Sequence, residues 1–262
     1  MIEIIKKHGF SYMADGIIAA SRPCIVGFSS DEQVGLGESK VGGNPHALDG
    51  FEWPYFKELR LEFVAQINCA EMTCPDFPKK GILLFFYDND GGRFSWDNKD
   101  FFRVFYYPCL DSLKEISAPQ ITRKRLWGLL GHYNLPKIYK EAKLDLKQNI
   151  SLPDIDRNIF NLRDEDDHDY FLDLLIELEG EEERFIQIHG YPNPVQTDTM
   201  ECEIVKITGR GHPDDWIMIL EISYDKRTDM AWGDGGHLYY FCHIDDLRNC
   251  DFSRCWMIEQ CS

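Results

Sequence analysis

The sequence predicts an α+β protein made of two similar, mainly antiparallel β units with a helical segment inserted between them. The first observation behind this prediction is a repeat of strand-like segments, which are residues 61–68 and 81–87 in one unit and 216–223 and 236–242 in the other. Gln66 corresponds to Glu221, and Gly81 to Gly236, at the same separation of 155 residues. Because chance rarely conserves such a gap-free spacing, we expect an internal duplication.

A second shared motif lies upstream of each strand pair. Gly43-Asn44-Pro45 precedes the first pair, and Gly190-Tyr191-Pro192 precedes the second at a separation of 147 residues. The repeat is therefore a whole supersecondary unit and more than one strand. We expect one compact domain. Its predicted parts are unit one at about 39–107, a helical insertion at about 112–180 and unit two at about 185–260 of the domain 1–262.

The segments before and within unit one are predicted from periodicity and turn residues. Residues 2–20 carry apolar side chains at helical spacing, so we expect a helix that is interrupted near Gly9 and ends before Pro23. Residues 29–54 are rich in Gly and Pro and predict a loop. The aromatic, β-prone run 101–107 predicts a further strand after the first pair.

Two helical regions are expected in the insertion. Residues 123–146 predict two short helices that break at Asn134-Leu135-Pro136. Residues 169–179 predict a helix that Gly180 ends, because five apolar side chains fall on one face: Tyr170, Phe171, Leu174, Leu175 and Leu178. Near the C-terminus, residues 255–259 predict a last strand.

Composition and charge exclude several classes of function. Hydrophobic residues make up 44% of the chain, which predicts a folded globular protein, and the formal net charge is -17, which argues against binding to a nucleic-acid backbone. The basic cluster 123–125 is expected on a solvated helix face, and the acidic runs 164–167 and 181–183 on a hydrated surface. No apolar run reaches the roughly 20 residues of a membrane span, and no signal peptide is recognisable, so we expect a cytoplasmic protein.

The cysteines predict reduced thiols. There are nine, an odd number, and none forms a Cys-x-x-Cys pair. Cys250, Cys255 and Cys261 lie close together in the sequence, and His243 precedes them, but this spacing does not match the common closed zinc sites. We therefore predict no metal site and no cofactor, and we expect any bound zinc to be adventitious.

The repeated strands place polar side chains at equivalent positions. In unit one, Phe63, Ala65 and Ile67 share one strand face and Gln66 lies on the other. In unit two, Met218, Leu220 and Ile222 are expected on one face, with Glu221 opposite. A cleft between units is a favoured place for a ligand, so Gln66 and Glu221 are candidate ligand-binding residues. The alternative, which we favour slightly, is that both side chains hold backbone groups in place.

Two further motifs contribute candidates. Trp232-Gly233-Asp234-Gly235-Gly236 is a glycine-rich turn in which Trp232 is a candidate stacking surface and Asp234 a candidate polar contact, although a plain tight connection is the favoured interpretation. His189 titrates near neutral pH, yet no nucleophile accompanies it, and a structural histidine is favoured there. Any small-molecule site is expected between the units, lined by Gly43, Gln66, His189, Glu221, Trp232 and Asp234.

Taken together, these motifs resemble those of the YwqG-like family, a widespread group of mostly bacterial proteins of unknown function. The resemblance covers residues 35–90 and 185–260, through the segments Ser39–Pro45, Trp53-Pro54, Phe63–Asn68, Gly81, His189–Pro192 with Gln196, and Trp232–Gly236. It implies a cytosolic, mixed α/β protein with an internal duplication, and it supplies no activity, cofactor or catalytic residue. This chain has Glu221 where the family usually has glutamine.

Two classes of function follow from the sequence. The first is a non-catalytic binding or interaction protein, such as an acidic partner that masks a basic protein as an immunity protein masks a toxin; the charge and the absence of a nucleophile and base pair motivate it. The second is a small-molecule-binding protein or an enzyme that uses a cleft between the two units. Whether the protein is an enzyme stays open at this point, and no nucleic-acid or membrane partner is expected.

Overall fold

The computed structural model describes residues 1–89, 99–120, 135–157, 159–160, 162–163, 165–180, 184–196 and 199–262. Among these residues, one large sheet of ten strands has the order β14-β13-β12-β11-β1-β10-β2-β6-β7-β8, and all its neighbouring strands are antiparallel. The bounds of these strands are β1 Arg22–Ser30, β2 Lys40–Val41, β6 Glu62–Asn68, β7 Ile82–Tyr87, β8 Phe102–Tyr107, β10 Ala142–Ser151, β11 Ile186–Ile188, β12 Trp216–Ile222, β13 His237–His243 and β14 Trp256–Gln260.

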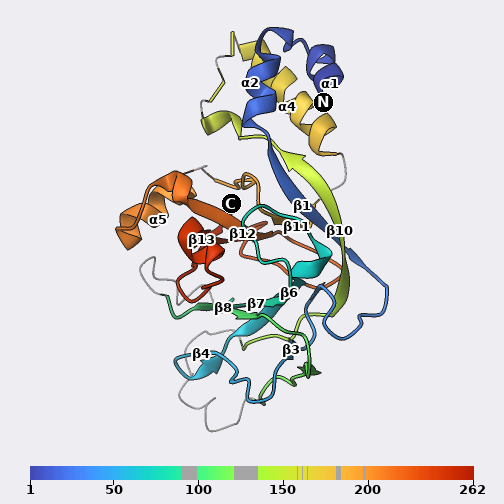
Figure 1. Ribbon diagram of the computed structural model, residues 1–262, viewed down its shortest axis with the longest axis vertical. Helices are drawn as coiled ribbons and strands as arrows, with labels where there is room; N and C mark the ends of the chain where they lie inside the picture. Colours follow the sequence, from blue (N-terminus) through green and yellow to red (C-terminus); the bar gives the residue numbers. More distant parts are fainter. Residues whose placement is uncertain are drawn as a thin grey trace.

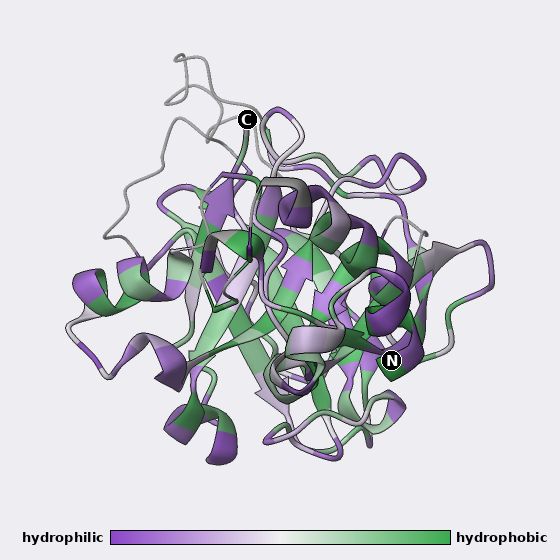
Figure 2. Ribbon diagram, turned by 90° about the horizontal axis from the view of Figure 1, so that it is seen from above, coloured by the Kyte–Doolittle hydropathy of each residue, from purple (hydrophilic) through white to green (hydrophobic). Residues whose placement is uncertain are grey.

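The sheet curls into a nearly closed barrel because its two ends bury apolar faces against each other. Phe85 of β7 lies 5.1 Å from Tyr240 of β13 between ring centroids, and Phe102 of β8 lies 6.3 Å from Trp256 of β14. Strands β8 and β14 are the two ends of the sheet and do not pair. Figure 2 shows the apolar residues gathered in the central strands and the polar residues on the surrounding helices and loops.

The helices lie in two places. Short helices α1 and α2 pack with α4 into a helical module around Phe10, Phe171 and Leu174, at one pole of the molecule (Figure 1). Helix α5 covers the outer face of β12–β14, and α6 follows β13. Their bounds are α1 Ile2–Lys7, α2 Ala14–Ala20, α4 Glu165–Glu179, α5 Met200–Thr208 and α6 Ile244–Arg248. None of the described helices combines the length and the apolar character that a membrane crossing requires.

Smaller elements complete the described part of the chain. Two pairs of short strands, β3 with β9 and β4 with β5, lie beside the barrel. Their bounds are β3 His46–Ala47, β9 Lys114–Glu115, β4 Tyr55–Phe56 and β5 Leu59–Arg60, and the 3-10 helices are η1 Ser11–Met13, η2 Cys69–Glu71, η4 Ile155–Arg157 and η5 Pro213–Asp215.

The repeated segments form two hairpins with the same pairing. In β6–β7, Phe63 pairs with Phe86 and the register shifts before Ala65. In β12–β13, Met218 pairs with Phe241 and the register shifts before Leu220, so each of these positions lies 155 residues beyond its counterpart. The bulge also corrects one expectation. Met218 packs beneath α5 instead of sharing a face with Leu220, because the extra residue interrupts the alternation of side chains.

Two long strands that the sequence did not predict join the hairpins. Strand β1 begins at Arg22, within a stretch expected only to end a helix, and pairs with β10 over nine residues. Residues 142–146, expected in a helix, form the start of β10 instead, while 121–134 lie outside the described residues. The long β1–β10 ribbon runs from the helical module into the barrel (Figure 1). The basic cluster 123–125 and the acidic run 181–183 also lie outside the described residues.

The other predicted elements have the expected type. The N-terminal helix is interrupted after Lys7 and ends at Ala20, and the predicted strand at 101–107 is β8. In α4, Phe171 and Leu174 are buried as expected, whereas Tyr170 is 55% exposed. Gly180 ends this helix with a φ of 98°. The last strand, β14, lies one residue later than predicted.

Candidate functional site

The candidate site is a cavity where the helical module meets the second hairpin. It has a volume of about 420 Å³, and its lining includes Arg184, Gln187, Glu221, Tyr224, Gly235 and His237. Arg184 and Gln187 belong to the segment that leads into and through β11, Glu221 lies on β12, and His237 begins β13. Gly180, directly after α4, lines the cavity on the side of the helical module. Four separate segments therefore converge on one polar cavity.

Glu221 is the most buried acid of this cavity. It is 4% exposed, its Oε2 accepts a hydrogen bond from the backbone N–H of Asn193 at 3.0 Å, and its Oε1 lies 3.0 Å from Nδ1 of His237. Because an ionised carboxylate only accepts hydrogen bonds, this contact places a proton of His237 on Nδ1. The other nitrogen, Nε2, has no hydrogen-bond partner among the described residues.

A second buried acid approaches the same cavity from α4. Glu179, the last residue of that helix, accepts a hydrogen bond from Leu152 N at 3.1 Å and forms an ion pair with Arg184. Burial raises the pKa of Glu179 and the neighbouring guanidinium opposes this rise, while the negative charge of Glu221 adds to it. Arg184 also donates to Gln187. The cavity is thus lined by one carboxylate, Glu221, and one guanidinium, Arg184, and Glu179 lies behind Arg184 as its ion-pair partner.

The equivalent position of unit one is closed. Gln66 is fully buried; its Oε1 accepts from His46 N at 2.9 Å, and its Nε2 donates to Glu38 O at 2.7 Å. Nε2 also lies 2.9 Å from Nδ1 of His46, which accepts from Gly37 N as well. Burial lowers the pKa of His46, in keeping with a neutral ring. Gln66 thus holds backbone groups of Glu38 and His46 and does not line the cavity.

Both polar side chains hold the loop after a Gly-x-Pro motif. Gln66 binds the amide of His46 and Glu221 binds that of Asn193, 147 residues further along the chain. A parallel contact comes from the neighbouring strand position: Lys40 Nζ donates to Asn44 O at 2.6 Å, and Gln187 Nε2 donates to Tyr191 O at 2.5 Å. The two units fix their loops in the same way.

The other predicted site residues do not line the cavity. Gly43 has a φ of 63°, and a Cβ there would lie 2.7 Å from an oxygen of Glu141, so close packing explains this glycine. His189 is 9% exposed and donates from Nδ1 to Pro23 O at 2.7 Å. Burial lowers the pKa of His189, so the ring is a neutral structural group near pH 7.

The glycine-rich turn is likewise a structural feature. Trp232 is fully buried, donates to Ser223 O at 3.0 Å and packs edge to face with Tyr87 and Tyr139, with ring centroids 5.8 and 5.6 Å away. It is a core residue and cannot offer a free face to a ligand. Asp234 is exposed, and its carbonyl accepts from Ser262 N at 3.2 Å. Of the six predicted residues, Glu221 is the one that lines this cavity.

Sequence reasoning missed Arg184, Glu179 and His237 as parts of the site. A signal existed for His237, because in the hairpin Glu221 pairs with Tyr239 and the residue two positions away is its diagonal neighbour on the same face. No such signal existed for Arg184 and Glu179. They approach Glu221 through the packing of the helical module on the barrel, and the sequence pattern does not specify that packing.

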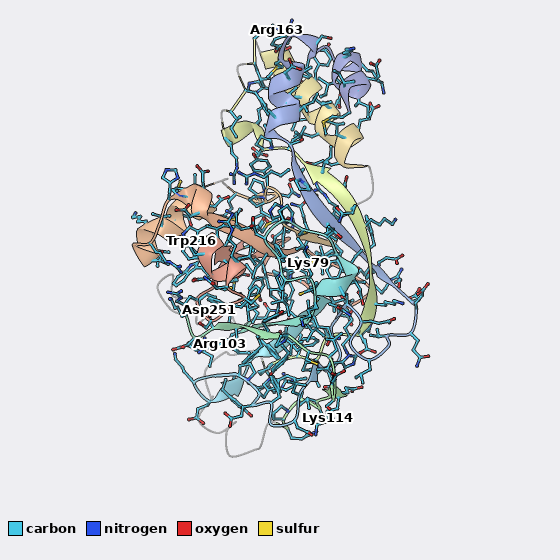
Figure 3. All side chains as sticks on the ribbon, viewed as in Figure 1. Lys79, Arg103, Lys114, Arg163, Trp216 and Asp251 are labelled. Carbon is cyan, nitrogen blue, oxygen red and sulfur yellow. The ribbon has the colours of Figure 1, made fainter. Side chains whose placement is uncertain are left out.

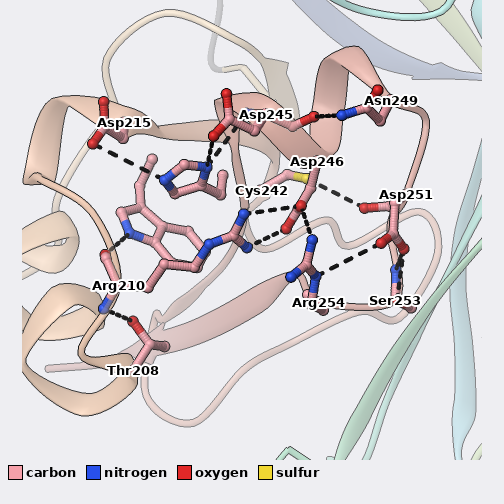
Figure 4. Close-up of polar contacts among 12 residues, drawn as sticks. Thr208, Arg210, Asp215, Cys242, Asp245, Asp246, Asn249, Asp251, Ser253 and Arg254 are labelled. Atoms are coloured by element: carbon pink, nitrogen blue, oxygen red, sulfur yellow. Dashed lines mark hydrogen bonds and ion pairs between the residues drawn. The ribbon is translucent and has the colours of Figure 1, made fainter.

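The densest cluster of charged groups elsewhere is a structural network (Figure 4). Asp246 of α6 is 2% exposed and forms ion pairs with both Arg210 and Arg254. Burial alone would raise its pKa, but the two guanidinium groups hold the pKa of Asp246 below its usual range. His243 caps α6 by accepting from Asp245 N at 3.3 Å. The network fastens α6 to the loop after α5 and to the loop before β14.

Within the described part of the chain, no group of three or more His, Cys, Asp or Glu side chains is arranged to hold a metal ion. All nine cysteines are free thiols, four of them buried. Cys255 contacts Cys242, and burial raises its pKa.

Comparison with known proteins gives a match to a protein family. No curated protein matches this sequence. A family model described as a domain of unknown function (DUF1963) matches residues 39–261, which include both hairpins, β10 and α4. The match therefore covers the whole candidate site. The chain belongs to the DUF1963 family.

Proposed function

We propose that the protein binds a small polar molecule with a positively charged group in the cavity lined by Glu221, His237 and Arg184. The observation that carries the proposal is the charge of this site. Glu221 is buried, and its partners are a backbone amide and the imidazole of His237, while Arg184 is already paired with Glu179. A buried carboxylate without a cation is costly. A cationic ligand group supplies that charge.

The hydrogen-bonding capacity of the cavity supports the same ligand class. In a neutral His237 with its proton on Nδ1, Nε2 is an acceptor, and the Glu221 oxygens retain lone pairs beyond their two hydrogen bonds. Both groups are matched by a ligand that donates several N–H groups, as a protonated amine does. The cavity volume of about 420 Å³ lies within the range typical of small-molecule sites.

A binding role is favoured over nucleophilic catalysis. A carboxylate that orients an imidazole is also found where a histidine acts as a general base. Such a histidine needs a nucleophile or a substrate proton within reach. The hydroxyl of Ser223, a residue that lines the cavity, donates to the carbonyls of Arg184 and Phe185 at 3.1 and 3.2 Å instead of to His237.

The test is a panel of amines and the substitution Glu221→Gln. We expect one of ethanolamine, lysine, agmatine or spermidine to raise the melting temperature at saturating concentration, and succinate to have no effect. A carboxamide at this position accepts from Asn193 N, as Gln66 accepts from His46 N, and turns its NH₂ toward Nδ1 of His237. The imidazole proton then moves to Nε2, which becomes a donor. Amine affinity should fall at least tenfold, with little loss of stability.

The control is Glu259→Gln, which makes the same chemical change at a buried acid that does not line this cavity. It should leave amine affinity unchanged. An unaltered amine affinity in Glu221→Gln, or the absence of any amine-dependent shift in the wild-type protein, contradicts the proposal.

A second proposal is an interaction with a basic protein, as an immunity protein masks a toxin. Its support is the net charge of -17 together with α4, which contains no Lys or Arg and exposes Leu172 and Ile176 beside Asp169 and Asp173. Acidic groups around an apolar strip suit a basic, amphipathic surface.

The probe for this second proposal is the basic protein encoded beside the gene of this chain. We expect a complex that 0.5 M NaCl weakens and that the pair Asp169→Lys and Asp173→Lys abolishes. The pair Glu52→Lys and Asp111→Lys makes the same charge change on exposed positions elsewhere and should weaken the complex far less. If both double variants lost affinity equally, the partner would be attracted by net charge alone, and a docking face on α4 would be excluded.

We also infer that the two units derive from one duplicated unit, and that the chain falls in the YwqG-like group of its family. The common register, the common bulge and the matched loop contacts of Gln66 and Glu221 support the duplication. The motifs Ser39–Pro45 and Trp232–Gly236 support the group. The nine unpaired cysteines support a cytosolic location.

A further inference from the structure

Strand β8 is the end of the sheet, and its outer edge is unpaired. In the described part of the chain, the backbone of Arg103–Tyr107 forms no backbone hydrogen bonds except those to β7. Alternate residues of an edge strand direct their N–H and C=O groups away from the neighbouring strand, and such an edge is a template for a further strand. Within the described part of the chain, the outer edge of β8 therefore has donors and acceptors at regular spacing with which no strand pairs.

A groove runs along this edge. It has a volume of about 370 Å³ and is lined by five consecutive residues, Phe102–Tyr106, together with the loop that precedes β14. Arg103 of β8 and Asp251 of that loop are labelled in Figure 3. The floor of the groove is apolar. It consists of Phe102, Val104 and Phe252, which line the groove and are each less than 9% exposed. The groove occupies the seam between β8 and β14, where the barrel is not closed.

At the opposite end of the sheet, a loop lies against the C-terminal end of β14. At β14, the side chain of Gln260 accepts from the amides of Val195 and Gln196 at 3.0 and 3.1 Å, and Gln196 Nε2 donates to Cys261 O at 2.5 Å. Natural sheets protect their edges in this way. The same protection is missing from the described surroundings of β8.

The charge at the groove indicates what fits it. Lys99 and Arg103 line it, in a chain whose net charge is -17. The ammonium of Lys99 lies 5.5 Å from the ring of Trp256. Arg103 donates to Lys99 O and Phe102 O at 2.6 and 2.9 Å and forms an exposed ion pair with Asp100 at 2.9 Å. Among the described residues, this exposed ion pair is the one carboxylate contact of the two cations. Acidic side chains opposite them form favourable cross-strand pairs.

We propose that β8 is a docking edge for an extended, acidic segment of a partner protein. The segment adds to the sheet as an eleventh strand. Its backbone pairs with Arg103–Tyr107, its alternate apolar side chains cover Phe102 and Val104, and its carboxylates face Lys99 and Arg103. Main-chain hydrogen bonds provide affinity, and the alternating pattern provides specificity, as in other cases of β-strand addition.

The probe is the peptide Ac-Glu-Val-Glu-Val-Glu-Val-NH₂, followed by fluorescence anisotropy with a labelled copy. We expect the pair Lys99→Glu and Arg103→Glu to weaken binding at least tenfold and to create binding of the Lys-Val counterpart. The control pair Lys6→Glu and Lys114→Glu changes exposed lysines away from the groove and should leave affinity within about twofold, a difference of ~0.4 kcal/mol. Glu221→Gln should have no effect, which separates this site from the cavity.

Two N-methylated peptides test the strand pairing itself. Methylation of alternate amides blocks the set that faces β8 in one isomer and the set that faces solvent in the other, so one isomer should bind and the other should not. Equal binding of both isomers, or no binding of the parent peptide, overturns the proposal. A dimer of the free protein that the Arg103→Glu variant abolishes would identify the occupant as a second copy of this chain and would also overturn it.

Discussion

The two hairpin units have the same register and the same loop contacts, yet they differ at one functional group. The carboxamide of Gln66 both accepts and donates hydrogen bonds, so it bonds to His46 N and to Glu38 O in a closed, neutral network. Glu221 only accepts, and it lies beside His237 in an open cavity. The comparison teaches that equivalent strand positions of the two units hold an amide in a closed network and a carboxyl group in an open cavity.

The neighbouring residues differ in the same direction. The counterpart of His237 in unit one is Ile82, which is fully buried. The counterpart of Ser223 is Asn68, whose Nδ2 donates to Gly37 O at 2.9 Å and thereby brings the loop of residues 35–38 against the strand. That loop fills the space beside Gln66. Unit two has no equivalent filling among the described residues, and the cavity results.

The largest expected effect concerns the core that both units share. Trp232→Ala should reduce the free energy of unfolding by about 3–5 kcal/mol, because it removes a fully buried indole between Tyr87 and Tyr139. Urea denaturation measures this loss. Trp232→Phe keeps most of the packing and should cost clearly less. A Trp232→Ala variant of normal stability that had lost ligand binding would instead assign the ring to a site.

An exchange of the two polar groups should affect the units unequally. Gln66→Glu places a carboxylate against Glu38 O in a fully buried position and should destabilise the protein by about 3 kcal/mol at pH 7. The reciprocal Glu221→Gln should cost less than about 1 kcal/mol, because the carboxamide retains an acceptor for Asn193 N. Equal losses measured by urea denaturation would mean that the two environments do not differ as described.

A smaller effect is expected at a contact between the units. Tyr87 of unit one donates to Glu259 of unit two at 2.5 Å, and burial raises the pKa of Glu259 while this hydrogen bond opposes the rise. A raised pKa means that the folded protein holds this proton more tightly, so wild-type stability declines as pH rises from below 4.5 through the raised pKa of Glu259. Glu259→Gln lacks this titration and should gain stability relative to wild type over that range. Denaturation at pH 4 and pH 7 checks the sign.

The smallest expected signal concerns zinc. Unit two alone carries the C-terminal cysteines Cys250, Cys255 and Cys261, and their spacing suits no closed four-ligand site. We expect elemental analysis of chelator-washed protein to find far less than one zinc per chain, with no change in melting temperature. A stoichiometric, tightly held zinc would show that this part of unit two has a function that unit one lacks.

Much of the fold was predictable because local patterns express it directly. The strands of both hairpins, β8, β14 and α4 have strong periodicity and clear ends. Strands β1 and β10 were missed for different reasons. In β1 a short apolar run follows a proline that was read as a helix end. In β10 the alternation of Leu144 and Leu146 with charged residues was present, but lysine and leucine also favour helices.

The candidate site was predicted only in part. The repeat pointed to Glu221, which lines the cavity, and equally to Gln66, which does not. Gly43, His189, Trp232 and Asp234 were chosen from residue type and motif density. Glycines with positive φ, buried aromatic rings and buried histidines have the same sequence signature whether they stabilise a loop or bind a ligand.

By itself, the sequence determined the pairing of each hairpin, since alternation and turn residues fix the register of neighbouring strands. It also determined the amide at position 66 and the carboxylate at position 221. Only the tertiary structure decided that the amide of Gln66 is fully buried in a closed network and that the carboxyl group of Glu221 lies in a cavity. That outcome depends on the β1–β10 ribbon and on the contact between Glu179 and Arg184, which join segments distant in sequence. Such long-range packing leaves no local pattern from which it can be read.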